Sequence, residues 1–131
     1  MIKKLIIIAA TVFALPALAQ IAVIVHPSNG ANLTNEELVR IYTGRSNAFN
    51  AVNLAESVPL RAQFDEKGVG RTSAQLKAHW SKLVFTGKGT PPTELASEQE
   101  VLNFVASNPQ AIGYISTASV SDAVKVALTI N

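Results

Sequence analysis

The sequence has 131 residues, and its 11 Lys and Arg against 9 Asp and Glu give a net charge of +2 at pH 7. Two lysines at positions 3 and 4 precede an apolar run over 5–15, and the pattern Ala17-Leu18-Ala19 follows it. A charged start, an apolar stretch and an A-x-A pattern are typical of a cleaved secretory signal peptide. The run has about half of the ~20 residues that span a bilayer, which disfavours the alternative of a retained membrane anchor. The sequence therefore predicts a signal peptide over 1–19 and one domain over 20–131.

Residues 20–131 are electrically neutral, because removal of Lys3 and Lys4 leaves nine basic and nine acidic side chains. A nucleic-acid-binding protein needs excess Lys and Arg to neutralise phosphates, so this class of partner is excluded. The chain has no Cys, which excludes disulfides, a lipid on Cys, and thiol or Cys-zinc chemistry. We therefore expect a soluble protein of the periplasm. A domain of this length folds around one core and is too short for two lobes.

The first part of the domain predicts a strand, a helix and a weaker strand. Residues 21–25 form an unbroken apolar run, which is typical of a strand buried on both faces. Thr34 and Glu37 form a capping box at the start of a helix, and Gly44 stands where a C′ glycine ends one. Residues 52–54 are the weaker strand candidate.

Two helices are expected in the middle of the chain. The first reaches Phe64 and has Pro59 near its first turn, where a missing N–H does no harm. The second and longest starts at Thr72 or Ser73 and ends at Gly87. Its apolar residues recur at i, i+4, i+7 and i+8, and this stripe is expected to face the core. The stripe consists of Leu76, Trp80, Leu83 and Val84.

The C-terminal part predicts one more helix and two strands. A second capping box, Ser97 to Glu100, opens the helix, and the strands are expected over 111–115 and 124–128. Helices that alternate with short apolar strands indicate the α/β class. The sequence therefore predicts a single three-layer lobe, in which a small mixed sheet of about four strands is flanked by helices.

Charge is concentrated in residues 61–88, which carry six basic and two acidic side chains. A local positive field of this kind attracts small anions even when the whole protein is neutral. The alternative is a solvated helix face, because Lys77, Lys82 and Lys88 lie off the apolar stripe.

No catalytic or metal-binding pattern is found in the sequence. Catalysis needs a nucleophile, a tuned acid or base, or a metal, and the only histidines are His26 and His79, with no HExxH spacing. Ser57 lies in no G-x-S-x-G elbow, and residues 87–90 lack the spacing of a phosphate loop. We therefore expect no enzyme, no metal site and no cofactor. We expect the ring of His26 to bond to loop backbone and His79 to lie on a helix face.

Polar segments follow three of the expected strands. Ligands of open α/β sheets bind beyond the carboxyl ends of strands, near helix N-termini whose free N–H groups attract anions. The segments 26–29, 56–59 and 116–117 offer hydroxyls or amides at such positions. Arg61 lies one turn into the helix that follows Ser57, where it adds a fork of hydrogen-bond donors. The alternative for each serine is an ordinary cap or turn residue.

The order of these motifs resembles phosphate-binding proteins of ABC transporters, and most closely a group of short, exported, single-lobe periplasmic-binding-protein-like relatives. The resemblance extends over essentially the whole chain after the signal peptide. It rests on five segments in register: Ile21–Pro27, Asn32–Gly44, Ser57–Phe64, His79–Pro92 and the AIGY strand Ala111–Tyr114.

The resemblance implies a type 2 periplasmic-binding lobe and, in full-length members, capture of an oxoanion between two lobes. Those members carry Ser-Gly-Thr before the ligand-facing helix, where this chain has Ser57-Val58-Pro59. The threonine hydroxyl and one backbone donor are therefore lost, and Ser57 and Arg61 remain as anion contacts. Because one lobe cannot close over a ligand, tight binding requires a partner lobe, a dimer or a different role.

We therefore expect an exported binding module for phosphate or a similar small oxoanion. Ser57 and Arg61 are expected to hold the anion, and Ser28 and Asn29 to contribute from the neighbouring loop. The alternative is a protein-interaction module for a membrane sensor or transporter, with no small ligand of its own. Residues 58–60 favour this alternative, because apolar side chains there replace donors.

Overall fold

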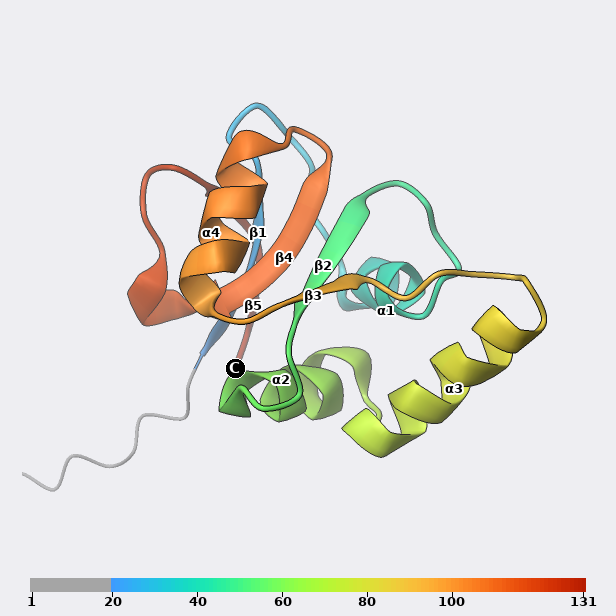
Figure 1. Cartoon of the computed structure of the whole chain (residues 1–131). Coiled ribbons are helices and arrows are strands. Elements are labelled where there is room, and N and C mark those ends of the chain that lie inside the picture. Colours follow the sequence, from blue (N-terminus) through green and yellow to red (C-terminus); the bar gives the residue numbers. More distant parts are fainter. Residues whose placement is uncertain (1–19) are drawn as a thin grey trace, which may run out of the picture.

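The computed structural model describes residues 20–131, so the predicted signal peptide lies outside the described residues. Within 20–131, no helix combines the length and the apolar character needed to cross a membrane. Strands and helices alternate along the chain (Figure 1), in the order β1 Ile21–Val25, α1 Asn35–Tyr42, β2 Asn50–Leu54, α2 Pro59–Phe64, α3 Ser73–Phe85, β3 Thr93–Leu95, α4 Glu98–Ser107, β4 Ala111–Ser116 and β5 Lys125–Ile130. A π-helical turn, Asp65–Val69, continues α2, and a 3-10 turn, Thr117–Ser119, follows β4.

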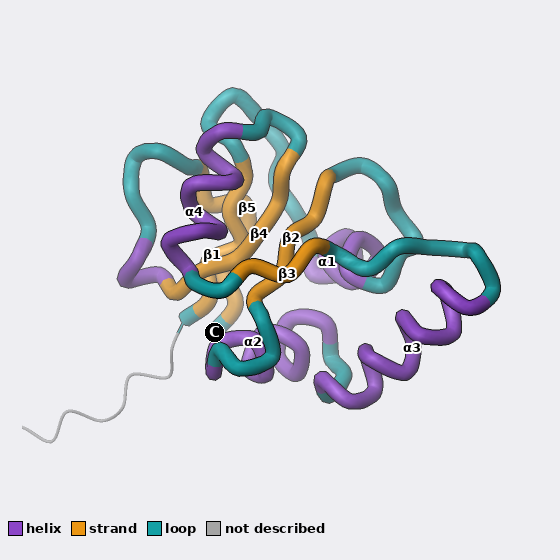
Figure 2. Tube along the Cα trace, in the orientation of Figure 1, coloured by secondary structure: helices purple, strands orange, loops and turns teal. Residues whose placement is uncertain are grey.

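The five strands form one mixed sheet in the order β3-β2-β4-β1-β5 (Figure 2). β2 runs parallel to β3 and β4, whereas β1 runs antiparallel to both β4 and β5. The predicted α/β lobe with a small mixed sheet is thus confirmed, with one strand more than expected. The additional strand is β3, which has only three residues, Thr-Glu-Leu, and no apolar alternation that would predict it.

β1 lies inside the sheet and is the most enclosed element of the fold. All five of its residues have no exposed surface, as expected for the apolar run 21–25. Its first residue, Ile21, pairs with Ser116 of β4 on one side and with Ile130 of β5 on the other. β1 therefore joins both of its neighbours through backbone hydrogen bonds while both of its faces are packed.

Consecutive residues of β4 show how the helices cover the two faces of the sheet. A Cβ on Gly113 would lie 2.6 Å from Val101 of α4, so this side of β4 faces α4. Tyr114 points to the opposite face, where its ring stacks on Phe64 of α2 with 3.6 Å between ring centroids. Tyr42 of α1 packs edge-on against Phe64 at 4.8 Å, which joins α1 and α2 beneath that face.

The three longer helices begin at the cap residues that the sequence predicts. The hydroxyls of Thr34, Thr72 and Ser97 accept hydrogen bonds from the backbone N–H three residues later. Gly44 and Gly87 have φ of +81° and +69° directly after the caps of α1 and α3, as expected for C′ glycines. Local hydrogen bonding thus fixes where these helices begin and end.

α3 corrects one expectation, because its apolar stripe does not face the core. Leu76 is buried, but Trp80 and Leu83 are only half-buried and 52% of Val84 is exposed. α3 is instead attached to the C-terminal end of α1, where Nε1 of Trp80 donates to the carbonyl of Tyr42 at 3.2 Å. Nε2 of His79 lies 2.8 Å from the carbonyl of Thr43, and since a carbonyl only accepts, that nitrogen carries the proton.

Gly113 gives a test of the packing between β4 and α4. Gly113→Ala places a methyl group against Val101, and we expect it to lower the free energy of unfolding by about 1–3 kcal/mol through overpacking. Val101→Ala removes the obstructing methyl groups. The double variant should therefore lose less free energy of unfolding than the two single variants lose in sum. Denaturant unfolding measures both effects.

The matched control is Gly30→Ala, because a Cβ there meets no atom within 4 Å. That variant should unfold within about 0.5 kcal/mol of the wild type. An equal effect of the two alanines would contradict the close contact between β4 and α4.

Candidate functional site

The direction of β1 separates the loop 26–29 from the segment that contains Ser57 and Arg61, although the sequence predicts that they meet. Val25, the last residue of β1, pairs with Ile112 near the start of β4. The loop 26–29 therefore lies at one edge of the sheet, and the loops after β2 and β4 lie at the opposite edge (Figure 1). The expectation that Ser28 and Asn29 join Ser57 and Arg61 in one site is wrong, because β1 is antiparallel to its neighbours.

Ser28 and Asn29 line a separate hollow of about 410 Å³, together with Phe49 and Pro109. Their polar groups hold the turn itself. The backbone N–H of Ser28 donates to Nδ1 of His26 at 3.1 Å, as expected for a histidine that bonds to loop backbone. Oδ1 of Asn29 accepts from the N–H of Ala31 at 3.1 Å. This loop is therefore a self-contained turn.

A larger groove of about 450 Å³ opens beside α3, and we call it the α3 groove. α3 forms one wall, and the loop that returns to β3 forms another. The apolar residues of these walls are Leu76, Trp80, Val84, Phe85, Pro91 and Pro92. Polar side chains from β2 and α2 also line the groove, including Asn53 and Arg61.

Arg61 is buried, with 6% of its surface exposed, and is held by three acceptors. Its Nε donates to Asp65 at 2.9 Å, and its Nη1 donates to the carbonyl of Leu54 at 2.7 Å and to Glu94 at 3.2 Å. Burial alone would lower the pKa of Arg61, but the charge of Asp65 and the hydrogen bonds to both carboxylates raise it. Arg61 is therefore a fixed cation at neutral pH.

The second terminal nitrogen of Arg61 is the one that remains available. Within residues 20–131, Nη2 makes no hydrogen bond, and it does not belong to the polar atoms buried without a partner. Arg61 lines the α3 groove, so Nη2 is the atom of this side chain that is left to bind a ligand there. Because the guanidinium group is planar, the hydrogen bonds of Nε and Nη1 also fix the position of Nη2.

Asp65 anchors Arg61 and also joins two helices. It has no exposed surface, and its Oδ2 accepts from Nε of Arg61 and, at 2.6 Å, from the hydroxyl of Ser73. Asp65 follows α2 directly, and Ser73 is the first residue of α3. The carboxylate thus fixes Arg61 and the start of α3 relative to each other.

Asn53 also lines the groove, although it is not among the site residues predicted from the sequence. Its Oδ1 accepts from the hydroxyl of Tyr114 and, at 2.9 Å, from the N–H of Leu54. With Oδ1 held by two donors, the amide nitrogen Nδ2 is left for the groove and makes no hydrogen bond within the described residues. The signal was present in the sequence as one polar residue between two apolar ones in a short strand, Val52-Asn53-Leu54.

Ser57 and Ser116 lie at the same edge of the sheet as Arg61 but not in the groove wall. Ser57 is exposed in the turn that the N–H of Val58 closes on the carbonyl of Ala55 at 3.0 Å. Ser116 is already hydrogen-bonded, because its N–H donates to Glu98 at 2.6 Å and its hydroxyl lies 3.0 Å from that of Ser119. Of the predicted site residues, the structure places only Arg61 in the groove and Ser57 beside it.

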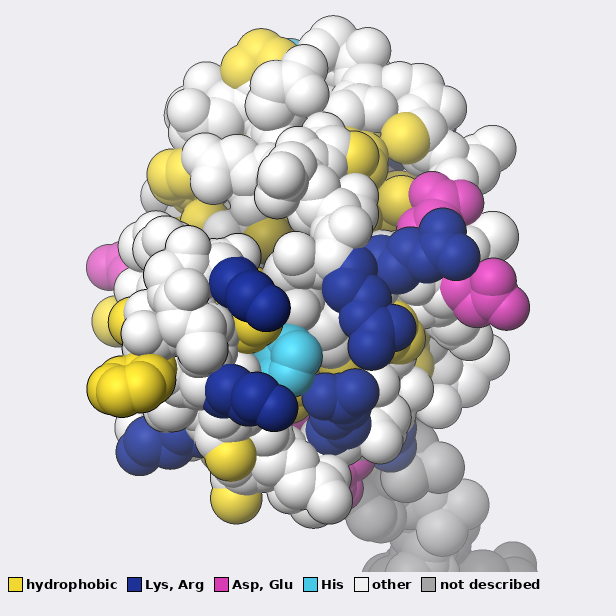
Figure 3. Space-filling view, turned by 90° about the vertical axis from the view of Figure 1, so that its right-hand side faces the viewer, with side chains coloured by type: hydrophobic (Ala, Val, Ile, Leu, Met, Phe, Trp, Pro, Cys, Tyr) yellow, Lys and Arg dark blue, Asp and Glu magenta, His cyan; other side chains and the backbone are white. Residues whose placement is uncertain are grey.

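The groove carries charges of both signs. Glu56, Glu94 and Lys77 line it together with Arg61. Lys and Arg side chains gather around one histidine on the side of the molecule that contains α3 (Figure 3). Residues 20–131 contain no group of three or more His, Asp or Glu arranged to hold a metal ion. The polar and charged side chains of the groove offer hydrogen bonding and ion pairing next to an apolar wall.

The ion pair at the groove gives a test by substitution. Arg61→Ala leaves Asp65 buried without its cation, and we expect it to lower the free energy of unfolding by about 3–5 kcal/mol. Glu94→Gln removes the other carboxylate, whose side chain is 51% exposed, and should change stability by less than about 1 kcal/mol. Denaturant unfolding of both variants is the measurement, and equal losses would contradict the distinction between the two pairs.

Comparison with known proteins supports the architecture described above. No curated protein matches the sequence. A phosphate ABC transporter substrate-binding protein of Clostridium perfringens, described as putative and solved with bound phosphate, is 25% identical with a TM-score of 0.67. The match covers 82% of this chain and 44% of that protein. An ABC-type phosphate transport receptor from Vibrio cholerae is 24% identical with a TM-score of 0.64, over 82% of this chain and 46% of the receptor.

PstS from Borrelia burgdorferi has the same fold at 19% identity, with a TM-score of 0.55 over 76% of this chain and 42% of its own. The chain thus spans less than half the length of each of these solved proteins. The predicted resemblance to substrate-binding proteins of phosphate ABC transporters is confirmed. The family described as "PBP superfamily domain" matches residues 14–129, and the chain belongs to this family of binding proteins.

Proposed function

We propose that this protein is an exported, periplasmic binding module for phosphate, and that the anion binds in the α3 groove at Arg61 and Asn53. The observation that carries the proposal is that Arg61 and Asn53 both line the groove, and that each has one donor nitrogen, Nη2 or Nδ2, with no hydrogen bond within the described residues while its other polar atoms are fixed by bonds. Donors held in place before binding lose little freedom when an anion arrives. The likeness to a protein solved with bound phosphate also supports it.

Ser57 keeps a place in this proposal as a contact at the rim, since it is exposed and adjacent to Glu56 of the groove. Ser28 and Asn29 have none, because they lie at the other edge of the sheet. The proposed partner of the loaded module is an ABC transporter, because the similar structures are an ABC-type phosphate transport receptor and a substrate-binding protein of a phosphate ABC transporter.

Two carboxylates in the groove set the selectivity that we expect. Glu56 and Glu94 line the groove with Arg61, and an ionised carboxylate only accepts hydrogen bonds. Phosphate at neutral pH carries a proton that it can donate to such an acceptor, whereas sulfate carries none. We therefore expect phosphate to bind in preference to sulfate.

Calorimetric titration of phosphate into the purified protein tests the proposal, with Asn53→Asp as the informative variant. This substitution keeps Oδ1 for Tyr114 and Leu54 but replaces the Nδ2 donor with a negative oxygen. We expect phosphate affinity to fall by roughly 10- to 100-fold. Ser57→Ala should weaken phosphate binding less than Asn53→Asp does, because water can take the place of an exposed hydroxyl as a hydrogen-bond partner of the anion.

The matched control is Asn29→Asp, which makes the same chemical change at the opposite edge of the sheet. Phosphate affinity should stay at the wild-type value in that variant, and circular dichroism should show that both variants fold. Equal binding of sulfate and phosphate, or equal loss in the two Asp variants, would contradict the proposed site.

A protein-interaction role, with a membrane sensor or transporter as partner, is the second candidate. The observation that favours it is the charge balance of Arg61, whose cation is already paired with Asp65 and Glu94. The mainly apolar walls of the groove also suit a protein surface better than a small anion. Absence of any phosphate-specific heat in the wild type would favour this role over the first.

A further inference from the structure

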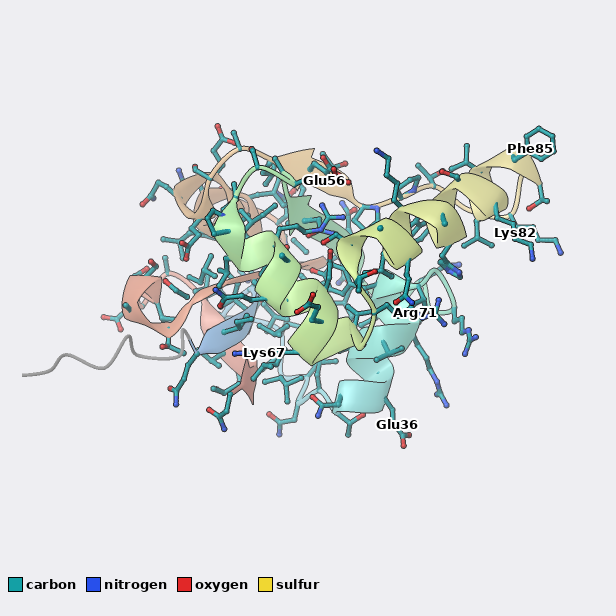
Figure 4. All side chains as sticks on the ribbon, turned by 90° about the horizontal axis from the view of Figure 1, so that it is seen from below. Glu36, Glu56, Lys67, Arg71, Lys82 and Phe85 are labelled. Carbon is teal, nitrogen blue, oxygen red and sulfur yellow. The ribbon has the colours of Figure 1, made fainter. Side chains whose placement is uncertain are left out.

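α3 exposes apolar surface that a core helix would bury. Phe85, at its C-terminal end, is 92% exposed, and the neighbouring Val84 is 52% exposed. Figure 4 shows Phe85 at the far end of α3, pointing away from the body of the protein. Both residues line the α3 groove, so the exposed side chains and the hollow belong to one surface. A contiguous apolar surface of this kind marks a contact site.

We propose that a second copy of this chain covers the α3 groove, and that Phe85 of each copy inserts into the groove of the other. A two-fold axis makes this possible, because it brings identical surfaces together and the surface must then complement itself. The α3 groove meets this requirement, since it presents an aromatic side chain and, beside it, a hollow of about 450 Å³ that accepts one.

The positions along α3 fix the register of the contact. Ser81 lies midway between Lys77 and Phe85, and all three residues line the groove. Antiparallel packing of the two α3 helices about Ser81 therefore places Lys77 of each copy next to Phe85 of the other. A lysine ammonium is attracted to an aromatic face and to the negative C-terminal end of a helix, and both are present there.

The charges of the groove are also self-complementary. Lys77 lies on its α3 wall, and Glu56 and Glu94 lie on the walls formed by the chain after β2 and by β3. When two such grooves face each other, each lysine has carboxylates of the second copy within the same interface. A groove with a single sign of charge would repel its own copy, and this groove carries both signs.

A second copy would also enclose the polar side chains that line the groove. A lone lobe leaves the donors of Arg61 and Asn53 open to solvent on one side. The second copy supplies the missing wall over them, whichever ligand the groove takes.

Sedimentation velocity across a range of concentrations tests the contact. The protein is expressed from residues 1–131 and purified from the soluble fraction, without added ligand. We expect a dimer, and we expect Phe85→Ser to raise its dissociation constant on the order of 100-fold, because the lost burial occurs twice in a symmetric dimer. Phe85 is exposed in the single chain, so this variant keeps its fold.

Val126→Ser is the matched control, because it removes another exposed apolar side chain, 38% exposed, from β5 instead of α3. Its dissociation constant should equal that of the wild type. A wild type that stays monomeric up to about millimolar concentration, or a Phe85→Ser variant that associates as the wild type does, would overturn the proposal. A segment of another protein would then be the expected occupant of the α3 groove.

Disulfide trapping tests the register independently, and the absence of Cys from the sequence leaves no background. Ser81→Cys lies at the proposed two-fold axis, so mild oxidation should convert most of the protein to a covalent dimer. Ser121→Cys, at an exposed serine outside the groove, should remain largely uncoupled. Equal coupling of the two variants would overturn the register. Both experiments contain no phosphate, so failure of the self-association and failure of phosphate binding are told apart.

Discussion

β1 is hydrogen-bonded along both edges and packed on both faces, and its direction decides which loops of the molecule can act together. Its five residues have no exposed surface, so the strand cannot shift without opening the core. Because it runs against β4 and β5, the turn after it opens at the edge where β2 and β4 begin. The polar groups at the other edge therefore form the candidate site without any help from residues 26–29.

Arg61 has two roles that limit each other. Its ion pair with Asp65 fixes the end of α2 and, through Ser73, the start of α3, so the guanidinium belongs to the structure of the lobe. The same contacts use most of its donors and balance its charge, which leaves one nitrogen for a ligand. In the proposed phosphate site, Arg61 would therefore position the anion but attract it only weakly, and a neighbouring donor such as Asn53 would contribute a large share of the binding.

The elements that rest on local chemistry are the ones the sequence predicts well. Thr34, Thr72 and Ser97 cap helices because their hydroxyls bond to the backbone three residues away, a relation that the sequence displays directly. The direction of β1 depends on pairing with residues about 90 positions away, which no local pattern encodes. The prediction that Ser28 and Asn29 join Ser57 and Arg61 in one site is wrong for that reason. Asn53 was overlooked because its role follows from Tyr114, a partner 61 residues away.

The helical period of α3 predicts that its stripe is buried but does not say against what. Leu76 meets the core of its own chain, whereas Trp80 and Leu83 pack on Gly44 and the loop near Gly89. Val84 and Phe85 continue the same apolar surface beyond the edge of the lobe, where nothing within residues 20–131 covers them. An apolar helical stripe that extends beyond the core of its own chain therefore indicates a contact with another molecule. The hydrophobic effect favours burial of the surface regardless of which molecule covers it. The exposed apolar surface at Val84 and Phe85 is therefore where a partner has to be sought.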